Sequence, residues 1–491
     1  MGKITTILSE LSMFFKKNAE KSAISSIMDI QKGLKVTDKV IGLSKHDNCK
    51  LTSFQVLTLL LLFPFFGIAG ASHYEDSVLG RLFRCKKDMF YSFLNDERIR
   101  WRGLLTCISL QILSKKNAGV PTGDQSSPVC LVADDTDEPK TGMKMELIGK
   151  TWSHVEHRMK LGYKCLTLLL TDGKTQTFLD FSLHGEKGKD EGKSQGLTAK
   201  QRAARHSEEH TTACSKERVE DYWKKKTDKL HEMVRKAVKD GIRFEYLLVD
   251  SWFTNTALVK FVLSFRKHRF HLLGMMKMAG TNFETRFGSI CPRSIVAKLK
   301  AEQKSGRKDG VKNIKVNKTL RCQWCMIDAK LGGKPVRLFF CKRGRKGDWN
   351  CLLTTDMTMG FLKAYRTYQM RWVTEVAYHD CKQLLGLGKC QSVSFNAQIA
   401  ATTITFMQYN ILSLVKRFHS YETIGELFEQ ALSGTVEFSI TDRIWQMLLS
   451  AIFAIAEKFS IYCPDLLKAI INEDEDIKAL LALNVNLRPT G

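Results

Sequence analysis

Residues 368 to 382 read YQMRWVTEVAYHDCK and contain the spacing Y-x2-R-x3-E-x6-K. We expect this stretch to be helical. With about 100° between successive residues of an α-helix, Arg371, Glu375 and Lys382 lie at roughly −60°, −20° and −40° from Tyr368. One narrow face of the predicted helix therefore carries a phenol, two cations and a carboxylate.

A second side of the same helix is expected to be apolar, through Val373, Val376 and Leu384. A purely structural interpretation of the polar face is also open, because charged residues on a solvated helix commonly pair at a spacing of four. The choice between the two depends on what the rest of the chain places beside this helix.

The chain has 491 residues, too many for one hydrophobic core, and we expect roughly three or four domains. With Lys+Arg 76 and Asp+Glu 51, the formal net charge is +25. Such a charge favours a polyanionic partner. Nucleic acid fits best, and an anionic membrane surface is the second choice.

The 14 cysteines form no repeated framework. A chain of this size needs no disulfides, so we expect reduced cysteines and a cytosolic protein. A zinc site made of Cys322, Cys325, Cys341 and Cys351 is a minor alternative. The sequence around the first two alternates like a strand, which would direct Cys322 and Cys325 to opposite faces.

Residues 51 to 72 contain no charge over a length that could span a bilayer. Pro64 stands at the centre of this stretch, and polar residues dilute its start. We expect two shorter elements, broken at the proline and buried in a helical domain. A single-span membrane protein is the alternative.

Two apolar runs of strand length lead into acidic residues. The first, VCLVADD, occupies residues 129 to 135, and the second, FEYLLVDSWF, occupies residues 244 to 253. An acid just past a buried strand lies where open α/β sheets bind ligands. Asp134 and Asp250 are therefore candidate site residues. Asp135 is a rival to Asp134, and helix capping is the structural alternative for such aspartates.

Other elements are predicted from their patterns. Residues 161 to 184 predict a hairpin with Asp172-Gly173 at the turn. A basic connector, residues 185 to 206, is expected to be a solvated loop, with DNA backbone contact as the alternative. Helical spacing is present at 4–15, 54–62, 104–113, 223–238, 254–265, 444–459 and 466–483, and strand-like spacing at 268–278, 319–328, 334–342 and 349–356.

If the two acid-tipped strands are adjacent and the helix of Glu375 crosses their ends, three carboxylates converge. Three anions in one cleft favour protonation unless a cation lies among them. Hard oxygen ligands select Mg²⁺ or Mn²⁺, and two such ions about 4 Å apart promote in-line phosphoryl transfer. Arg371 and Lys382 would then bind phosphate oxygens.

From about residue 125 to 415, the chain resembles DDE transposases of the IS4 family, insertion-sequence enzymes with an RNase H-like catalytic domain. Tyr368, Arg371, Glu375 and Lys382 match that family's Y-(2)-R-(3)-E-(6)-K signature at every spacing.

Both strand-terminal acids take part in this resemblance. Asp134-Asp135-Thr136 resembles the family's D-x-T motif, which favours Asp134 over Asp135. Asp250 is similar to the second acid, although Ser251-Trp252 replaces the glycine that often follows it. The long gap between Asp250 and Glu375 fits the β-rich insertion of the family.

The resemblance implies that Asp134, Asp250 and Glu375 are catalytic and bind two Mg²⁺ or Mn²⁺ ions. They would hydrolyse the strand at each transposon end and then direct the freed 3′-hydroxyl at target DNA. The expected route is cut-and-paste through a hairpin intermediate.

Four residues of the signature stretch are expected to bind DNA. Tyr368, Arg371 and Lys382 would hold phosphates. Trp372 would stack on an unpaired base or, alternatively, lie in the core beside Val376.

Two residues nearby are expected to be secondary. His379 lies about 20° from the line of Tyr368, within reach of DNA or Glu375, and is interpreted as a neighbour rather than a catalyst. Lys140 is expected to be solvated, with a DNA contact as the alternative.

The predicted fold class is α/β, with an RNase H-like catalytic core that a mostly β insertion interrupts. The predicted regions are a helical N-terminal DNA-binding region (1–122), the first part of the core (123–279), the β-rich insertion (280–355), the second part of the core (356–416) and a helical C-terminal region for dimerisation (417–491).

The expected partners are double-stranded DNA, as transposon ends and as target, and a second copy of the chain on that DNA. We expect no membrane association and a place in the bacterial cytoplasm, at the nucleoid. Two alternatives stay open: an RNase H-like nuclease that cuts without joining, and a transposase-derived DNA-binding protein without activity.

Overall fold

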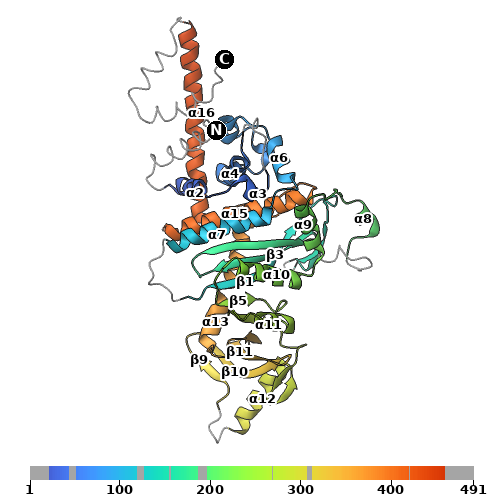
Figure 1. Cartoon of the computed structure of the whole chain (residues 1–491). Helices are drawn as coiled ribbons and strands as arrows, with labels where there is room; N and C mark the ends of the chain where they lie inside the picture. Colours follow the sequence, from blue (N-terminus) through green and yellow to red (C-terminus); the bar gives the residue numbers. More distant parts are fainter. Residues whose placement is uncertain are drawn as a thin grey trace.

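The computed structural model describes residues 22–43, 51–118, 127–153, 156–185, 196–267, 269–306, 312–344, 346–419 and 421–458. The chain is a mixed α/β protein built on one large sheet with helices around it (Figure 1). The strand order is β2-β3-β1-β5-β6-β12-β11-β10-β7-β8, with β4 paired to β3 and β9 to β10.

In the view of Figure 1, the strands near the candidate acids form the upper part of the sheet. Strand β3 lies antiparallel to β1, β2 and β4, whereas β5 lies parallel to both β1 and β6. The bounds are β1 Cys130–Pro139, β2 Gly149–Ser153, β3 Arg158–Thr171, β4 Gln176–His184, β5 Tyr246–Val249 and β6 His271–Met276.

The predicted β3–β4 hairpin forms. Its turn includes Asp172, whose Oδ1 accepts from the backbone N–H groups of Lys174 and Thr175. Gly173 has φ +87°, a left-handed conformation that glycine adopts at little cost. Arg417 and Lys116 both pair with Asp172, which ties the turn to the helices above it.

Residues 280 to 355 extend this sheet and do not form a separate one. Strand β12 pairs antiparallel with β6, and β11 and β10 follow as antiparallel neighbours. The bounds are β7 Phe283–Thr285, β8 Gly288–Ile290, α12 Pro292–Ser305, β9 Lys315–Asn317, β10 Cys322–Leu331, β11 Lys334–Arg343 and β12 Trp349–Thr354. The predicted domain boundaries stay predictions.

Helices of the first region lie above the sheet, together with α15 and α16 (Figure 1). Helices α7 and α15 run side by side and contact β4. The bounds are α2 Ala23–Lys32, α3 Asp38–Ile41, α4 Ser53–Leu62, η1 Phe63–Phe66, η2 Ala71–His73, α5 Val78–Phe83, α6 Asp88–Asn95, α7 Trp101–Ala118, α15 Phe395–Phe418 and α16 Ile424–Lys458.

The uncharged stretch 51–72 forms two buried elements, as predicted. Helix α4 ends at Leu62, and the 3-10 helix η1 begins at Phe63 with Pro64 in its first turn. No helix among the described residues is long and apolar enough to cross a membrane. Helix α4 packs against α6 and α15.

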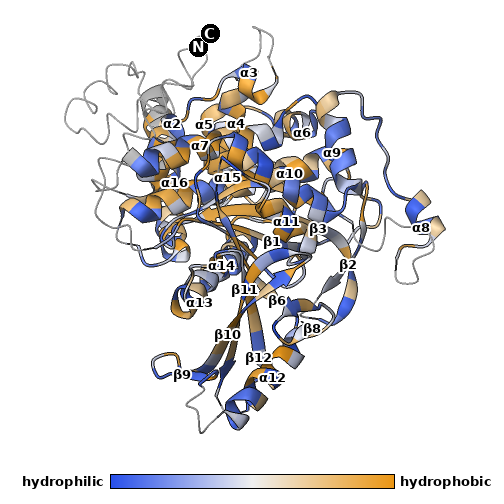
Figure 2. Ribbon diagram, turned by 60° about the horizontal axis from the view of Figure 1, so that its bottom comes forward, coloured by the Kyte–Doolittle hydropathy of each residue, from blue (hydrophilic) through white to orange (hydrophobic). Residues whose placement is uncertain are grey.

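Two hydrophobic cores lie on the two faces of the sheet, because successive strand residues point to opposite sides. Cys130 and Val132 belong to the core that includes α4, α7, α14 and α15, whereas Leu131 and Ala133 belong to the core that includes α10 and α11. Figure 2 shows hydrophobic residues concentrated around α4, α7 and α15.

Some helices differ from the predicted ones. The helix predicted for 223–238 is α10, Lys226–Lys239, and a separate helix α9, Ala213–Trp223, precedes it; α8 spans Ala199–Ala203. The helix predicted for 254–265 is α11, Thr256–Val262. The helix predicted for 444–459 is the last part of the much longer α16. The helices predicted for 4–15 and 466–483 lie outside the described residues.

Candidate active site

Asp134 and Asp250 occupy neighbouring positions on adjacent parallel strands. The last paired residues of β1 and β5 are Ala133 and Val249, and each acid is the next residue of its strand. Neighbouring strands of a sheet lie about 4.8 Å apart, so the two acids start close together. The predicted adjacency of the two strands is confirmed.

One detail of that prediction is wrong. Asp134 does not end its strand, because β1 continues to Pro139 through pairing with β3. What stops after Ala133 is the pairing with β5 alone. The helix-capping alternative is also wrong for both acids: Asp134 lies within a strand, and the N-cap of α11 is Asn255, not Asp250.

The two sides of β1 meet different helices, and we name them after those helices. The α14 face carries Cys130, Val132, Asp134, Thr136 and Glu138, and the α10 face carries Leu131, Ala133, Asp135 and Asp137. The sidedness follows from strand alternation.

We predicted one continuous helix for the signature stretch, but the structure contains two. Helix α13, Phe361–Gln369, contains Tyr368, and helix α14, Trp372–Gln383, contains Glu375 and Lys382. Met370 and Arg371 lie between them in right-handed helical conformation, with φ −62° and −58°. Arg371, Glu375 and Lys382 therefore all follow the break, with Arg371 as the N-cap of α14.

The buried side of α14 also differs from the predicted apolar stripe. Its buried residues are Thr374, Ala377, Tyr378 and Cys381. Val376 is instead 48% exposed. Val373 and Leu384 of the predicted stripe pack, partly buried, against the core that α14 shares with β1 and α15, so the prediction fails at Val376.

Arg371 joins two of the three candidate acids. Its guanidinium donates to Asp134 Oδ2 and, over 2.6 Å, to Glu375 Oε1. The i,i+4 pair of Arg371 with Glu375 is therefore real, but the same cation also reaches across to the sheet. A charged pair of solvated residues on a helix surface does not explain that second contact.

The pKa of Asp134 is raised from its ordinary value to about 7, because burial penalises the charged form. Arg371 opposes this shift, whereas the charges of Asp135 and Asp250 add to it. Asp134 thus lies in surroundings where a further positive charge would be favourable.

Asp250 is oriented by the turn that follows β5. Its Oδ1 accepts from the backbone N–H of Trp252 over 2.9 Å and from that of Phe253 over 3.2 Å. The turn thereby fixes the carboxylate at the edge of the sheet, beside Asp134.

The remaining signature residues contact the backbone or side chains of the two acidic strands. Tyr368 donates its hydroxyl to the Val249 carbonyl over 3.3 Å. Lys382 Nζ donates to Thr136 Oγ1 over 2.8 Å, and burial lowers the pKa of Lys382. Both side chains therefore lie on the α14 face, close to the acids.

Tyr378 is a residue that the sequence analysis missed. Its hydroxyl donates to the Asp134 carbonyl over 3.0 Å and lies 2.5 Å from Thr167 Oγ1. The side chain is buried and pins α14 to β1 and β3. Tyr378 lies three residues after Glu375, and residues three apart are neighbours on a helix, which could have indicated that Tyr378 lies near the site.

Asp135 belongs to the opposite face and has its own cations. Lys226, the first residue of α10, lies 2.7 Å from Asp135 Oδ2, and Lys164 lies 3.5 Å from Oδ1. Asp137, two residues on, also pairs with Lys164. The geometry therefore separates Asp134 from its sequence neighbour.

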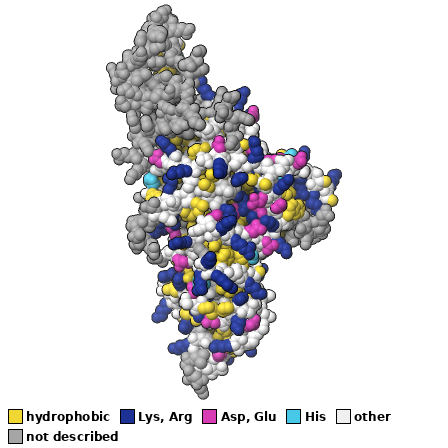
Figure 3. Space-filling model, viewed as in Figure 1, with side chains coloured by type: hydrophobic (Ala, Val, Ile, Leu, Met, Phe, Trp, Pro, Cys, Tyr) yellow, Lys and Arg dark blue, Asp and Glu magenta, His cyan; other side chains and the backbone are white. Residues whose placement is uncertain are grey.

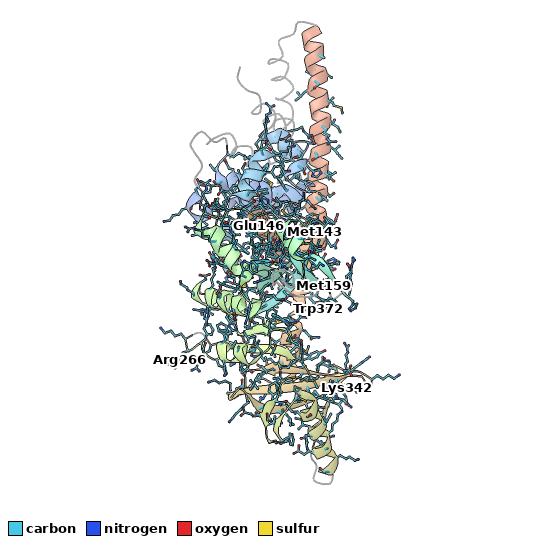
Figure 4. The ribbon with its side chains drawn as sticks, turned by 90° about the vertical axis from the view of Figure 1, so that its right-hand side faces the viewer. Met143, Glu146, Met159, Arg266, Lys342 and Trp372 are labelled. Atoms are coloured by element: carbon cyan, nitrogen blue, oxygen red, sulfur yellow. The ribbon has the colours of Figure 1, made fainter. Side chains whose placement is uncertain are left out.

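Trp372 and His379 are exposed. Trp372 is 61% exposed, so the alternative of a core tryptophan is wrong. Figure 4 places it at mid-height, between the helical upper part and the β-rich lower part. His379 lies 3.6 Å from Asp380, and its side chain is 71% exposed.

The expectation of a solvated Lys140 is wrong. This lysine is buried, and its Nζ donates to the carbonyls of Gly388 over 2.7 Å and Cys390 over 3.2 Å. It also lies near Glu138, whose pKa burial raises. Lys140 thus fastens the loop after α14 to the end of β1.

No group of three or more His, Cys, Asp or Glu side chains that could hold a metal ion occurs in the part of the chain that the structure describes. Asp134 and Asp250 are adjacent, whereas Arg371 lies between Asp134 and Glu375. Cys322 and Cys325 pack into different cores, as strand alternation predicts, so the four cysteines do not gather around one point.

Residues 77–270 match a family described as DDE superfamily endonuclease. The matched range contains Asp134 and Asp250 and ends before Glu375. The match supports a DDE transposase-type family and a nuclease or transposase function acting on DNA. A search of curated proteins gave no match.

Proposed function

We propose that this chain is a DNA transposase of the IS4 type, which cleaves DNA at element ends and transfers the freed strand to target DNA. One observation carries the proposal. Asp134 and Asp250 follow the last paired residues of two adjacent parallel strands, and Arg371 connects Asp134 to Glu375 of the signature helix.

The sheet supports an RNase H-like core within this proposal. The five strands β4-β3-β1-β5-β6 combine an antiparallel half with a parallel half, and β1 lies at the junction. Sites in α/β sheets commonly form where the strand order changes direction. Both aspartates lie at that junction.

Divalent ions fit two of the three carboxylates directly. Asp134 and Asp250 are adjacent oxygen donors, and a bound cation would offset the burial and the neighbouring acids that raise the pKa of Asp134. Glu375 completes the set once Arg371 releases it. We propose that Asp134, Asp250 and Glu375 hold two Mg²⁺ or Mn²⁺ ions, which supply activation of the attacking hydroxyl and stabilisation of the leaving oxygen.

Arg371 has a specific part in this proposal. In the protein alone, its guanidinium neutralises Asp134 and Glu375. When DNA binds, the same group can turn to a phosphate oxygen, because guanidinium binds phosphate and carboxylate with similar geometry. Tyr368 and Lys382 border the same position and would orient the phosphate, and the exposed Trp372 would stack on an unpaired base.

DNA is the proposed macromolecular partner. The net charge of +25 attracts a polyanion, and Figure 3 shows Lys and Arg side chains over the visible face from the helical end to the β-rich end. A homodimer on DNA is part of the proposal, because two element ends must be held together. In its support, α16 exposes apolar side chains, which are Val436, Ile440, Ile444, Met447 and Leu448.

The test uses Glu375→Gln and duplex DNA that carries the inverted repeats flanking the coding region. We expect the variant to bind this DNA and to cleave it at least about 10³-fold more slowly with Mg²⁺, since it loses one charged ligand worth several kcal/mol. Glu429→Gln, on the exposed surface of α16, is the matched control. Strand cleavage and joining are followed on denaturing gels.

Other results would replace the proposal with a named alternative. Wild-type cleavage without joining identifies a nuclease, and DNA binding without cleavage in Mg²⁺ or Mn²⁺ identifies an inactive DNA-binding protein. A Glu375→Gln variant that cuts at the wild-type rate removes Glu375 from the metal site.

A further inference from the structure

Trp252 is a large aromatic side chain held in an exposed position beside the candidate acids. It is 49% exposed. Its backbone N–H donates to Asp250 Oδ1 over 2.9 Å, and its ring meets the buried Phe253 edge-on, with 4.7 Å between ring centroids. The indole is therefore fixed in place by its neighbours, although much of its surface faces water.

Lys226 lies against the same indole. Its Nζ is 4.3 Å from the centroid of the Trp252 ring and 2.7 Å from Asp135 Oδ2. The lysine side chain is only 12% exposed, so the cation–π contact and the ion pair are both partly desolvated and correspondingly stronger. Lys226 is also the first residue of α10, where the helix dipole is positive.

The chain just before Lys226 adds residues of the same two kinds. Trp223 is 48% exposed at the end of α9, and Lys225 is exposed between the two helices. Lys226 is the third residue after Trp223, which keeps their Cα atoms within about 11 Å. Trp223 and Lys225 are thus exposed within three positions of Lys226, which itself contacts the Trp252 ring.

Alternating aromatic rings and cations match one ligand better than others. Unpaired nucleotides present flat bases, which stack on indole rings, and phosphates, which lysines bind. A paired duplex offers phosphates but keeps its bases stacked inside. A purely structural latch between α10 and the turn after β5 would account for Lys226 and Asp135, but it gives no reason for two exposed tryptophans.

We propose that Trp252, Lys226, Lys225 and Trp223 form a platform for unpaired nucleotides next to the cleavage position. This inference rests on the proposed function and goes beyond it. The platform lies on the α10 side of the acids, whereas Trp372 lies on the α14 side. The two sides would receive nucleotides from the two sides of the scissile phosphate.

The experiment compares two labelled DNAs with the full-length protein in EDTA, so that no cleavage occurs. One is a paired duplex with the inverted repeat, and the other has the same sequence with a short unpaired run at the cleavage position. Affinity is measured by fluorescence anisotropy. We expect Trp252→Ala to weaken binding of the unpaired DNA by about tenfold and binding of the paired duplex by less than about twofold.

Matched variants separate stacking from folding and from general charge. Leu263→Ala removes another exposed apolar side chain, at the C-cap of α11, and should change neither affinity. Lys226→Ala should lower the slope of log affinity against log salt by about 1, whereas Lys239→Ala, at the other end of α10, should not. Trp252→Phe keeps an aromatic ring and should retain most of the preference, and thermal melting checks that each variant folds.

The outcomes distinguish this inference from the proposed function. If the wild type binds and cleaves inverted-repeat DNA but Trp252→Ala and Trp252→Phe leave the preference for unpaired DNA unchanged, the platform is wrong and the transposase proposal stands. Equal losses on both DNAs also overturn the platform. If the wild type binds neither DNA, both proposals fail.

Discussion

The two faces of strand β1 carry the same residue type in opposite circumstances. Asp134, on the α14 face, has one arginine that it shares with Glu375, and its pKa is raised to about 7. Asp135, on the α10 face, has Lys226 and Lys164 close to its two oxygens. Adjacent residues therefore differ: Asp134 is a buried carboxylate with a raised pKa, and Asp135 is a carboxylate beside two lysines.

This difference shows how the two faces of one strand can have different roles. On the α14 face, burial and the charges of Asp135 and Asp250 raise the pKa of Asp134, so a bound cation would be favourable there, as a metal-dependent site requires. On the α10 face, full pairing of Asp135 fixes Lys226, and Lys226 in turn lies against Trp252. We infer that the α14 face carries out the chemistry and binds the scissile phosphate, whereas the α10 face holds unpaired nucleotides next to it.

The largest predicted effect compares Asp134→Asn with Asp135→Asn in cleavage of inverted-repeat DNA. Asp134→Asn should slow cleavage by about 10³-fold or more, because it removes a charged metal ligand. Asp135→Asn should slow cleavage by less than about tenfold, because it only loosens Lys226. Single-turnover cleavage rates in Mg²⁺ measure both.

Circular dichroism of both variants provides the folding control. A larger loss for Asp135→Asn than for Asp134→Asn would exchange the assigned roles of the two faces and move the metal ligand by one position.

The next effect concerns stability against pH without divalent ions. Asp134 titrates near pH 7 in the folded protein and near pH 4 when unfolded, so from pH 4 to 7 the folded state holds the extra proton. Ionisation of Asp134 therefore costs stability as the pH rises through this range. Asp134→Asn should remove that loss, on the order of 3 kcal/mol, and become more stable than the wild type at pH 8.

Thermal melting at pH 5 and pH 8 in EDTA measures this difference. Asp135→Asn is the comparison and should lower stability at pH 8 by about 1 kcal/mol, because Lys226 and Lys164 lose a partner. A wild type that is more stable than Asp134→Asn at pH 8 would show that Arg371 fully compensates the buried charge.

The smallest effect concerns Lys382, which lies farther along the α14 face. Lys382→Ala should weaken DNA binding by about tenfold and lower the salt slope by about 1, if its ammonium turns from Thr136 to a phosphate. Lys389→Ala, on the exposed loop after α14, is the control. Anisotropy titrations over a range of salt concentrations measure both variants.

An unchanged salt slope together with a lower melting temperature would give a different result. Lys382 would then act only by holding Thr136, and the phosphate contacts of this face would come from Arg371 alone.

Much of the fold could be predicted from local patterns. The apolar runs before Asp134 and Asp250 are strands, and the Asp172-Gly173 turn joins β3 to β4, because strand and turn signals extend over a few residues. The break between α13 and α14 at Met370 and Arg371 carries no such signal, since neither residue is a helix breaker. The same holds for the burial of Lys140.

The candidate site could be predicted only in part, because local sequence patterns do not show contacts between distant segments. The sequence proposes the acids and Arg371 as site residues, but the contact of Arg371 with Asp134 joins residues that are far apart in the chain. Trp252, Lys226 and Tyr378 went unnoticed because each gains its meaning from a partner on another element. No spacing within one segment reveals such a pair.

The sequence by itself determined the candidate residues, which are the acids and the cations beside Glu375, and the strands that lead to the acids, because residue identity and periodicity are local properties. Only the tertiary structure decided which acid meets which cation. The alternation of β1 sends Asp134 to Arg371 and Asp135 to Lys226, and the charge of a carboxylate depends on the burial and the partners that its face provides.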